Sequence, residues 1–273
     1  MGGQDSPGEM PSKITTARGW ECHKLQGLSE FLELHTRPVR EDSFLLVPFF
    51  MRTPYCRDVA CDIESPTRRI VKARFSRFIF VAGDDGELGE IKRETSGTTT
   101  VEIVNGNINT QKTLRAVFDN LPRSSSCFAL IDPGGYKRLR WSTVKKLANY
   151  GRDWEGHKTE LLIFLPLEMA LLRNLTRQEC QKSLDRFFGD QEWHEIKEKR
   201  LRGEFDFEKT RKTVLDLYLK NLKSLGYRFI EAYQPSGRAF YQVLSASDRQ
   251  NQLNCIKAAW GRPRYLPCEL FYG

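Results

Sequence analysis

Residues 127–136 read Cys-Phe-Ala-Leu-Ile-Asp-Pro-Gly-Gly-Tyr, and this stretch decides the fold because an unbroken apolar segment ends abruptly at an acid. Five apolar residues without polar alternation predict a strand buried on both faces, as in the middle of a parallel sheet. Asp132 stands at the carboxyl end of that strand, where such sheets bind ligands. Pro133 then turns the chain, and Gly134 and Gly135 leave its backbone open to an approaching ligand. The alternative interpretation is that Asp132 caps this turn or the next helix.

Other short apolar segments alternate with helical patterns along the chain. Strands are expected at residues 44–47, 78–82, 101–104, 127–131 and 161–165. Amphipathic segments separate them, so the strands are expected to form a parallel, doubly wound sheet. Residues 227–232 and 239–244 flank a Gln-Pro-Ser-Gly link that is too short for a helix and predicts a hairpin. The expected fold class is α/β, a mostly parallel, doubly wound sheet with a C-terminal antiparallel hairpin.

The helical pattern also predicts how the domain is organised. One α/β domain is expected over residues 20–260, with a helical insertion at about 167–205, between a flexible segment 1–19 and a tail 261–273. Within the insertion, Thr176 is expected to cap a helix that ends at Gly189. Ser247 is expected to cap the last helix. Residues 83–86, Gly-Asp-Asp-Gly, are interpreted as a turn-rich loop.

Composition narrows the class of protein. The chain has 273 residues, enough for a full core, and a formal charge of +8, which favours an anionic partner such as nucleic acid. Residues 1–12 are polar and do not resemble a signal peptide, and no apolar run is long enough to span a bilayer. Seven scattered cysteines fit reduced thiols, and Cys22, Cys56 and Cys61 lack the spacing of a metal site. We therefore expect a soluble, cytoplasmic protein without a metal and without a membrane partner.

The predicted layout, five parallel strands and a terminal hairpin, resembles class I S-adenosylmethionine-dependent methyltransferases. Three motifs make it similar to one group of them, the three-Cys-motif partner (TcmP) family, over about residues 21–260. That family carries an Asp-Pro-aromatic-Gly ledge, a Phe-Pro-x-x-Met segment ending in Arg, and a Phe-Gly before a Trp. The corresponding parts of this chain are residues 132–135 before Trp141, residues 163–169 before Arg173, and residues 184–189 before Trp193.

The cofactor motifs depart from the family's pattern. Its Asp-x-Phe-Ala-Gly loop corresponds to residues 47–51, Val-Pro-Phe-Phe-Met, whose large side chains would fill the space of the cofactor's carboxypropyl group. The acid expected to hold the ribose hydroxyls falls at Ala82, with Asp84 nearby, and the acid expected beside the adenine falls at Asn107. The resemblance thus implies an S-adenosylmethionine site that is weak or lost. Its candidate cofactor-binding residues are Pro48, Asp84 and Asn107.

The ledge keeps its acid. In related amino-methyltransferases an Asp-Pro-Pro-Tyr ledge orients an amine, since the acid and a backbone carbonyl accept its hydrogens while the aromatic ring supports the substrate. The resemblance implies these roles for Asp132 and Tyr136, although Gly134 replaces the usual aromatic residue. The candidate catalytic residues are Asp132, Pro133, Gly134, Gly135 and Tyr136.

Three functional hypotheses follow. The first is a TcmP-like protein with a degraded cofactor site that acts as a partner or scaffold for a three-Cys-motif protein or another macromolecule. The second is an active methyltransferase of an unknown amine or nucleic-acid acceptor, which binds its cofactor through Asp84, Asn107 and Asp132. The third is a basic nucleic-acid-binding module, although a solvated helix face also explains such charges. Its basic runs are Arg68, Arg69, Lys72, Arg74 and Arg77, and then Lys137, Arg138, Arg140, Lys145 and Lys146.

Overall fold

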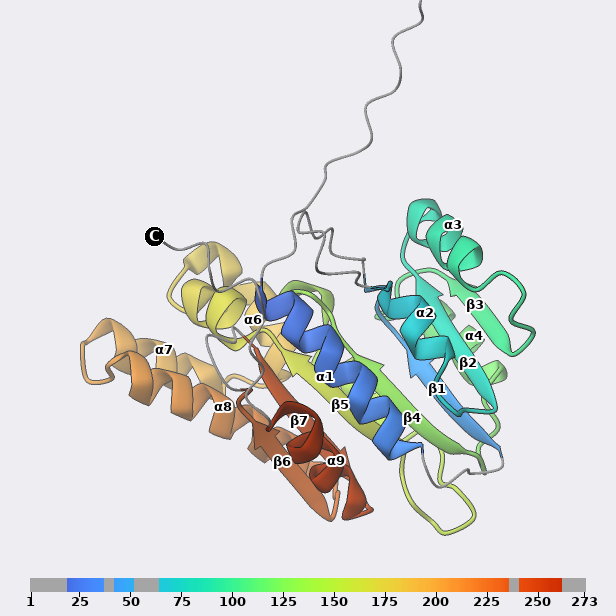
Figure 1. Cartoon of the computed structure of the whole chain (residues 1–273). Coiled ribbons are helices and arrows are strands. Elements are labelled where there is room, and N and C mark those ends of the chain that lie inside the picture. Colours follow the sequence, from blue (N-terminus) through green and yellow to red (C-terminus); the bar gives the residue numbers. More distant parts are fainter. Residues whose placement is uncertain (1–18, 37–41, 52–63, 236–240, 262–273) are drawn as a thin grey trace, which may run out of the picture.

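A seven-stranded sheet forms the centre of the computed structural model, which describes residues 19–36, 42–51, 64–235 and 241–261 (Figure 1). Its strand order is β3-β2-β1-β4-β5-β7-β6. The strands are β1 (Ser43–Val47), β2 (Arg77–Ala82), β3 (Val101–Asn105), β4 (Ser126–Ile131), β5 (Glu160–Leu165), β6 (Phe229–Tyr233) and β7 (Gln242–Ser247). The first five are parallel, and β7 runs antiparallel to β5 and β6. The expected α/β class, with its C-terminal antiparallel pair, is confirmed.

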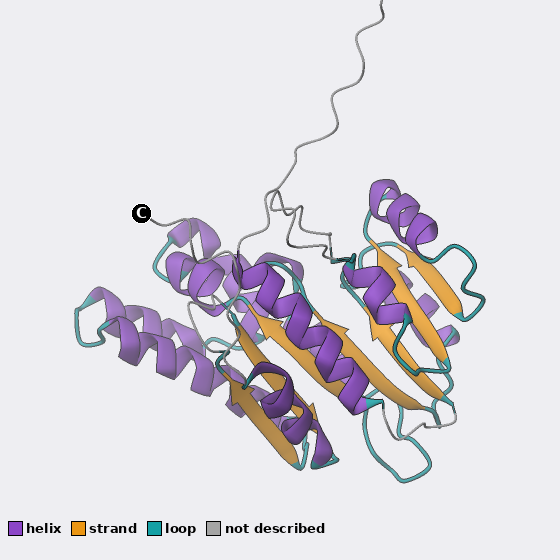
Figure 2. Cartoon of the chain, viewed as in Figure 1, coloured by secondary structure: helices purple, strands orange, loops and turns teal. Residues whose placement is uncertain are grey.

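Helices cover both faces of the sheet (Figure 2). Alternate residues of each strand face opposite layers, as Leu45 and Val47 do on one side and Phe44 and Leu46 on the other. One layer holds α1 (Gly19–His35), α2 (Pro66–Val71), α3 (Asp85–Glu94) and α9 (Asn251–Trp260). The other holds α4 (Gln111–Asp119), α5 (Trp141–Ala148) and α8 (Phe207–Ser224). The sheet is therefore doubly wound, and β4 lies inside it between β1 and β5.

Residues 167–205 are helical, as expected. They form η2 (Leu167–Leu172), η3 (Gln178–Cys180), α6 (Gln181–Phe188) and α7 (Glu192–Leu201). Gly189 ends α6 in the left-handed region at φ +76°, which confirms the predicted stop. Thr176 does not cap a helix, because η3 begins at Gln178 and leads directly into α6.

Two further differences concern helix starts. Residues 83–86 do not form a simple loop, because Asp84 accepts a hydrogen bond from the Glu87 N–H at 2.8 Å and caps α3. Only Leu88 and Ile91 give α3 an apolar face, so its sequence pattern is weak. Ser247 is the last residue of β7 and caps no helix, since α9 begins four residues later.

Some predictions fall outside the described residues, namely those for Cys56, Cys61, the segment 1–18 and nearly all of the tail. The same holds for residues 236–240, which include the end of the predicted hairpin link and the start of the predicted strand 239–244. Among the helices that the structure describes, none combines the length and apolar character needed to cross a membrane.

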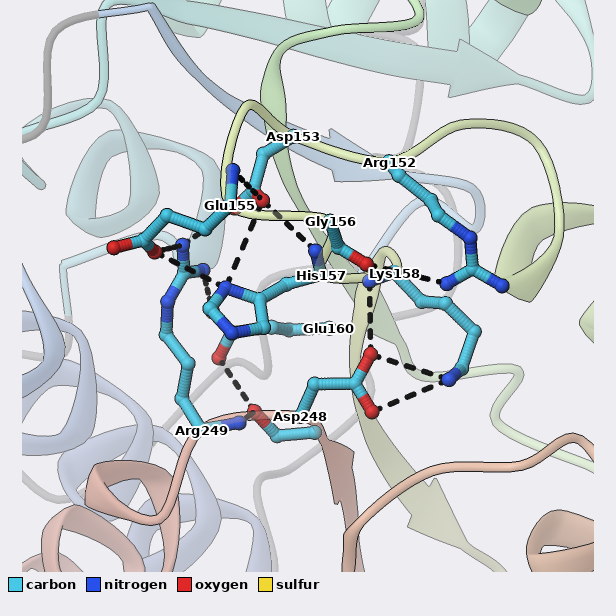
Figure 3. A network of polar contacts seen from close by, with 10 residues as sticks. Arg152, Asp153, Glu155, Gly156, His157, Lys158, Glu160, Asp248 and Arg249 are labelled. Carbon is cyan, nitrogen blue, oxygen red and sulfur yellow. Dashed lines mark hydrogen bonds and ion pairs between the residues drawn. The ribbon is translucent and has the colours of Figure 1, made fainter.

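At the amino end of β5, a charge network ties the loop before this strand to the segment after β7 (Figure 3). Arg249 donates hydrogen bonds to Asp153, to Glu155 at 2.6 Å and to Glu160 at 3.0 Å, and we call these contacts the Arg249 clamp. The side chains of Asp153 and Glu160 are each 2% exposed. The clamp thus compensates two deeply buried carboxylates at the edge of the sheet opposite to Asp132.

The clamp also sets the charge state of its acids. Burial by itself raises the pKa of Asp153, but the His157 N–H and the Arg249 guanidinium donate to the carboxylate and bring its pKa below the usual value. Ligand atoms of Asp153, Glu155 and His157 lie within 4.8 Å of one another, close enough to hold a metal ion. Because Arg249 already compensates both carboxylates, we assign this cluster a structural role.

Candidate functional site

The carboxyl ends of β1 to β4 bring the predicted site positions to one edge of the sheet, the carboxyl edge. Pro48 follows β1, Asp84 follows β2, Asn107 follows β3 and Asp132 follows β4. Ligands of doubly wound sheets bind at this edge. The structure therefore places the four positions at the same edge of the sheet, where Asp84, Asn107 and Asp132 form contacts within the chain.

Residues 132–135 form the ledge at the end of β4. Asp132 is 6% exposed, and its Oδ1 accepts a hydrogen bond from the Gly134 N–H at 3.4 Å. Gly134 has a φ of +64°, in the left-handed region that favours glycine. A Cβ added to Gly134 or Gly135 would meet no heavy atom of the described chain within 4 Å. The described chain thus leaves open space beside both glycines, whereas the acid of the ledge is buried.

The carboxylate of Asp132 has a cationic partner within the chain. Lys24 of α1 places its Nζ 2.5 Å from Oδ2 of Asp132, and the two side chains are 14% and 7% exposed. The same ammonium lies 5.5 Å from the centroid of the Phe164 ring. Removal of one partner from a buried pair leaves an uncompensated charge, which destabilises a protein strongly. Sequence reasoning missed Lys24 as a part of this site.

Tyr136 lies in the core on the opposite side of the sheet from α1. It is 2% exposed at the start of η1 (Tyr136–Arg138), and its ring meets the edge of Phe187 at a centroid distance of 6.2 Å. Ser183 donates a hydrogen bond to its hydroxyl oxygen at 3.4 Å. Burial raises the pKa of Tyr136 above the ordinary value. A role for Tyr136 in supporting a substrate stays a prediction.

The loop after β1 is packed with side chains. Pro48 and the three residues after it are all buried. Phe50 and Met51 belong to the core on the α1 side of the sheet, whereas Phe49 belongs to the core on the α4 side. The predicted filling of this loop by large side chains agrees with their exposures of 4% for Phe50 and 7% for Met51.

The polar residues after β2 and β3 form local turns. Asp84 caps α3, as described above, and its side chain is exposed. The side-chain oxygen of Asn107 accepts hydrogen bonds from the backbone and side-chain nitrogens of Asn109 at 2.9 and 3.0 Å. These contacts are the common turn and cap roles of such residues. Cofactor binding by Pro48, Asp84 and Asn107 stays a prediction.

A bridge across the carboxyl edge was also missed by the sequence analysis. Glu87 is buried, and its carboxylate accepts a hydrogen bond from the Gly83 N–H at 2.7 Å. The same carboxylate forms an ion pair with Arg138 at 3.4 Å. The Arg138 guanidinium lies 5.7 Å from the centroid of the Phe49 ring. Arg138, which follows β4, therefore contacts both the loop after β1 and the first turn of α3. The sequence indicated the role of Glu87 only through its spacing from Asp84, which is typical of a capping box at the start of a helix.

Comparisons with known proteins identify no family for this chain. No protein-family model matches the chain, and no curated protein matches it by sequence. One solved structure that it resembles is the plantazolicin methyltransferase BamL in complex with a triazolic desmethylPZN analog and SAH, at 10% identity and a TM-score of 0.36 over 83% of each chain. This similarity assigns neither a family nor an activity. The strand order and the antiparallel C-terminal pair themselves give the chain a methyltransferase-like, Rossmann-type α/β fold.

Proposed function

We propose that the chain is a TcmP-like protein whose S-adenosylmethionine site is lost and which acts as a partner or scaffold for another macromolecule. The Lys24–Asp132 ion pair carries this proposal. Asp132 is the acid that the ledge motif retains, and its carboxylate already binds the ammonium of Lys24 from the same chain. An incoming amine would have to displace a partly buried ammonium at 2.5 Å before it reached that carboxylate. The pair supports a structural role for Asp132.

The other loops of the carboxyl edge support the same proposal. Phe50 and Met51 are part of the core at the point where the family's pattern has a small residue for the cofactor to approach. Ala82 offers no acid for ribose hydroxyls, and Arg138 bridges the neighbouring loops. These residues do not fit S-adenosylmethionine, so we assign no step of a methyl transfer to them.

The resemblance suggests a three-Cys-motif protein as the partner, and the scattered cysteines of the sequence favour the cytoplasm as the compartment. Cys127 and Cys180 are buried thiols outside any disulfide, which supports a reducing environment. Burial raises the pKa of Cys127 to about 12, so this thiol is inert at neutral pH.

Thermal unfolding with and without cofactor tests the proposed loss of the site. A ligand present at about 100 times its Kd raises the free energy of unfolding by about 2.7 kcal/mol, which shifts the Tm of a protein of this size by several degrees. We expect no shift with S-adenosylmethionine or S-adenosylhomocysteine at about 1 mM, a concentration that would reveal a Kd of about 10 µM. A rise of several degrees that Asp132→Ala abolishes would overturn the proposal.

The open ledge favours a second candidate, an active methyltransferase of an unknown amine or nucleic-acid acceptor. Gly134 and Gly135 leave room above Asp132 for a ligand to approach the backbone. Incubation with methyl-labelled S-adenosylmethionine and amine or RNA acceptors tests this candidate. Label transferred by the wild type but not by Asp132→Asn would support it, and no transfer would remove it.

A further inference from the structure

The charge of the chain is distributed unevenly. Residues 110–152 contain nine Lys and Arg against two Asp, whereas the whole chain has 43 Lys and Arg against 35 Asp and Glu. One of these two acids, Asp132, is paired with Lys24. The region includes α4, α5 and the loops beside them, and nine cations against two acids give it a formal excess of seven positive charges.

A groove with a volume of about 650 Å³ lies between α4 and α5, and we call it the α4–α5 groove. Three cationic side chains line the groove, those of Arg115, Arg123 and Lys146. Among the described lining residues, Asp119 is the one carboxylate. Its volume falls within the range of about 300–1,000 Å³ that is usual for ligand sites. The groove thus combines a concave shape with an excess of positive charge.

The cations of this groove have no carboxylate partner among the described residues: Arg115, Arg123 and Lys146 are exposed and form no ion pair there. Some cations elsewhere differ, because Lys199 pairs with Glu195 and Lys220 pairs with Glu192, each at 2.6 Å. In the first predicted basic run, Lys72 pairs with Glu64 and Arg77 with Glu102. The three cations that line the α4–α5 groove therefore keep their charge uncompensated by any ion pair among the described residues.

An aromatic wall gives the groove a fixed shape. Tyr150 stacks on Phe118 with ring centroids 3.9 Å apart, and its hydroxyl lies 2.6 Å from the carbonyl oxygens of Phe118 and Leu121. The Arg123 guanidinium lies 5.8 Å from the Tyr150 ring centroid. Burial raises the pKa of Tyr150, so the phenol stays neutral at physiological pH and adds no negative charge.

We propose that the α4–α5 groove binds the phosphate backbone of single-stranded nucleic acid. Single-strand sites typically combine a positively charged groove with aromatic side chains, and this groove has both. The exposed large apolar side chains Trp154, Leu201, Phe207 and Phe229 lie outside the groove lining, so insertion into a lipid surface is not favoured there. The inference goes beyond the proposed scaffold role, because no lining residue belongs to the loops that hold Asp132, Asp84 or Asn107.

Fluorescence anisotropy with labelled oligonucleotides of about 20 uridines or thymidines tests this site at several salt concentrations. The test variant is Arg115→Gln/Arg123→Gln/Lys146→Gln. The matched control is Arg202→Gln/Lys212→Gln/Lys220→Gln, which removes the same charge from exposed, ion-paired positions. We expect the test variant to bind at least about tenfold more weakly and to lower the slope of log affinity against log salt by about 2, with the control unchanged.

The comparison of RNA with DNA decides whether the groove reads the backbone alone or also the sugar hydroxyl. Wild-type affinity of the groove variant for the oligonucleotides would overturn the proposal, and so would an equal loss of affinity in the control variant. Displacement of the oligonucleotide by polyglutamate as readily as by unlabelled oligonucleotide would overturn the assignment to nucleic acid and point to an acidic protein. Circular dichroism of each variant establishes that it is folded.

Discussion

Lys24 and Asp132 are 108 residues apart in the sequence and 2.5 Å apart in space. The sequence identified Asp132 because a strand of five apolar residues ends at it. It also held a signal for Lys24, which lies four residues before Leu28 on the face that α1 buries against the sheet. A lysine on a buried face needs a partner. The identity of that partner could not be predicted, because it depends on how α1 packs across the sheet (Figure 1).

Lys24→Met tests the buried pair. The substitution keeps an unbranched side chain but leaves the Asp132 carboxylate without this cation, so we expect the free energy of unfolding to fall by about 3–5 kcal/mol. Urea unfolding at neutral pH measures the change. Lys92→Met, at an exposed position of α3, serves as the matched control and should stay within about 0.5 kcal/mol of the wild type.

The double variant Lys24→Met/Asp132→Asn should regain part of the lost stability, since neither charge then remains buried. A single Lys24→Met variant as stable as the wild type would show that the pair does not hold α1 to the ledge.

At the scale of elements, local patterns predicted the strands well and the helix ends unevenly. The end of α6 could be predicted because Gly189 follows a clear apolar repeat. The start of α3 could not, since its apolar face consists of Leu88 and Ile91 alone. The close packing of Trp141 against Gly189 was also beyond the sequence, because it joins two helices from separate segments.

Gly189→Ala is expected to destabilise the protein by about 3 kcal/mol. The left-handed backbone costs about 1–2 kcal/mol for a residue with a Cβ, and overpacking adds about 1–3 kcal/mol. The added Cβ would lie 2.2 Å from a ring carbon of Trp141. Gly203→Ala is the matched control, since its φ is +74° and an added Cβ meets nothing within 4 Å. Equal losses in denaturant unfolding of the two variants would refute the packing argument.

In the whole molecule, contacts between distant segments link the loops at both ends of the strands, the amino ends and the carboxyl ends. The Arg249 clamp joins residues 153–160 to the segment after β7, and Arg138 joins the loops of the carboxyl edge. The α/β class and the terminal hairpin were predictable because hydrophobic periodicity and link lengths are local features. The clamp, the bridge and the α4–α5 groove were not, because each depends on side chains that only the folded sheet brings together.

Removal of the clamp should change stability in a pH-dependent way. The pKa of Asp153 is lowered in the folded chain, so its contribution is present above its unfolded pKa of about 3.9 and is lost as the pH falls through the folded value. Arg249→Met should destabilise the protein by about 3 kcal/mol at pH 7, with a smaller deficit at about pH 3. Urea unfolding at both pH values checks this. Arg152→Met changes an exposed residue of the same loop and should leave the free energy of unfolding and its pH dependence unaltered. A loss of stability in Arg249→Met that is equal at both pH values would show that the ionisation of Asp153 does not contribute through the clamp.

Isothermal titration calorimetry of the wild-type protein with S-adenosylhomocysteine measures whether the carboxyl edge still binds the product of the cofactor. If the site is lost, no binding is measurable up to about 1 mM ligand. A Kd of about 10 µM or tighter, weakened in Asp132→Ala, would contradict the loss of the site and would establish a working cofactor site despite the Lys24–Asp132 pair.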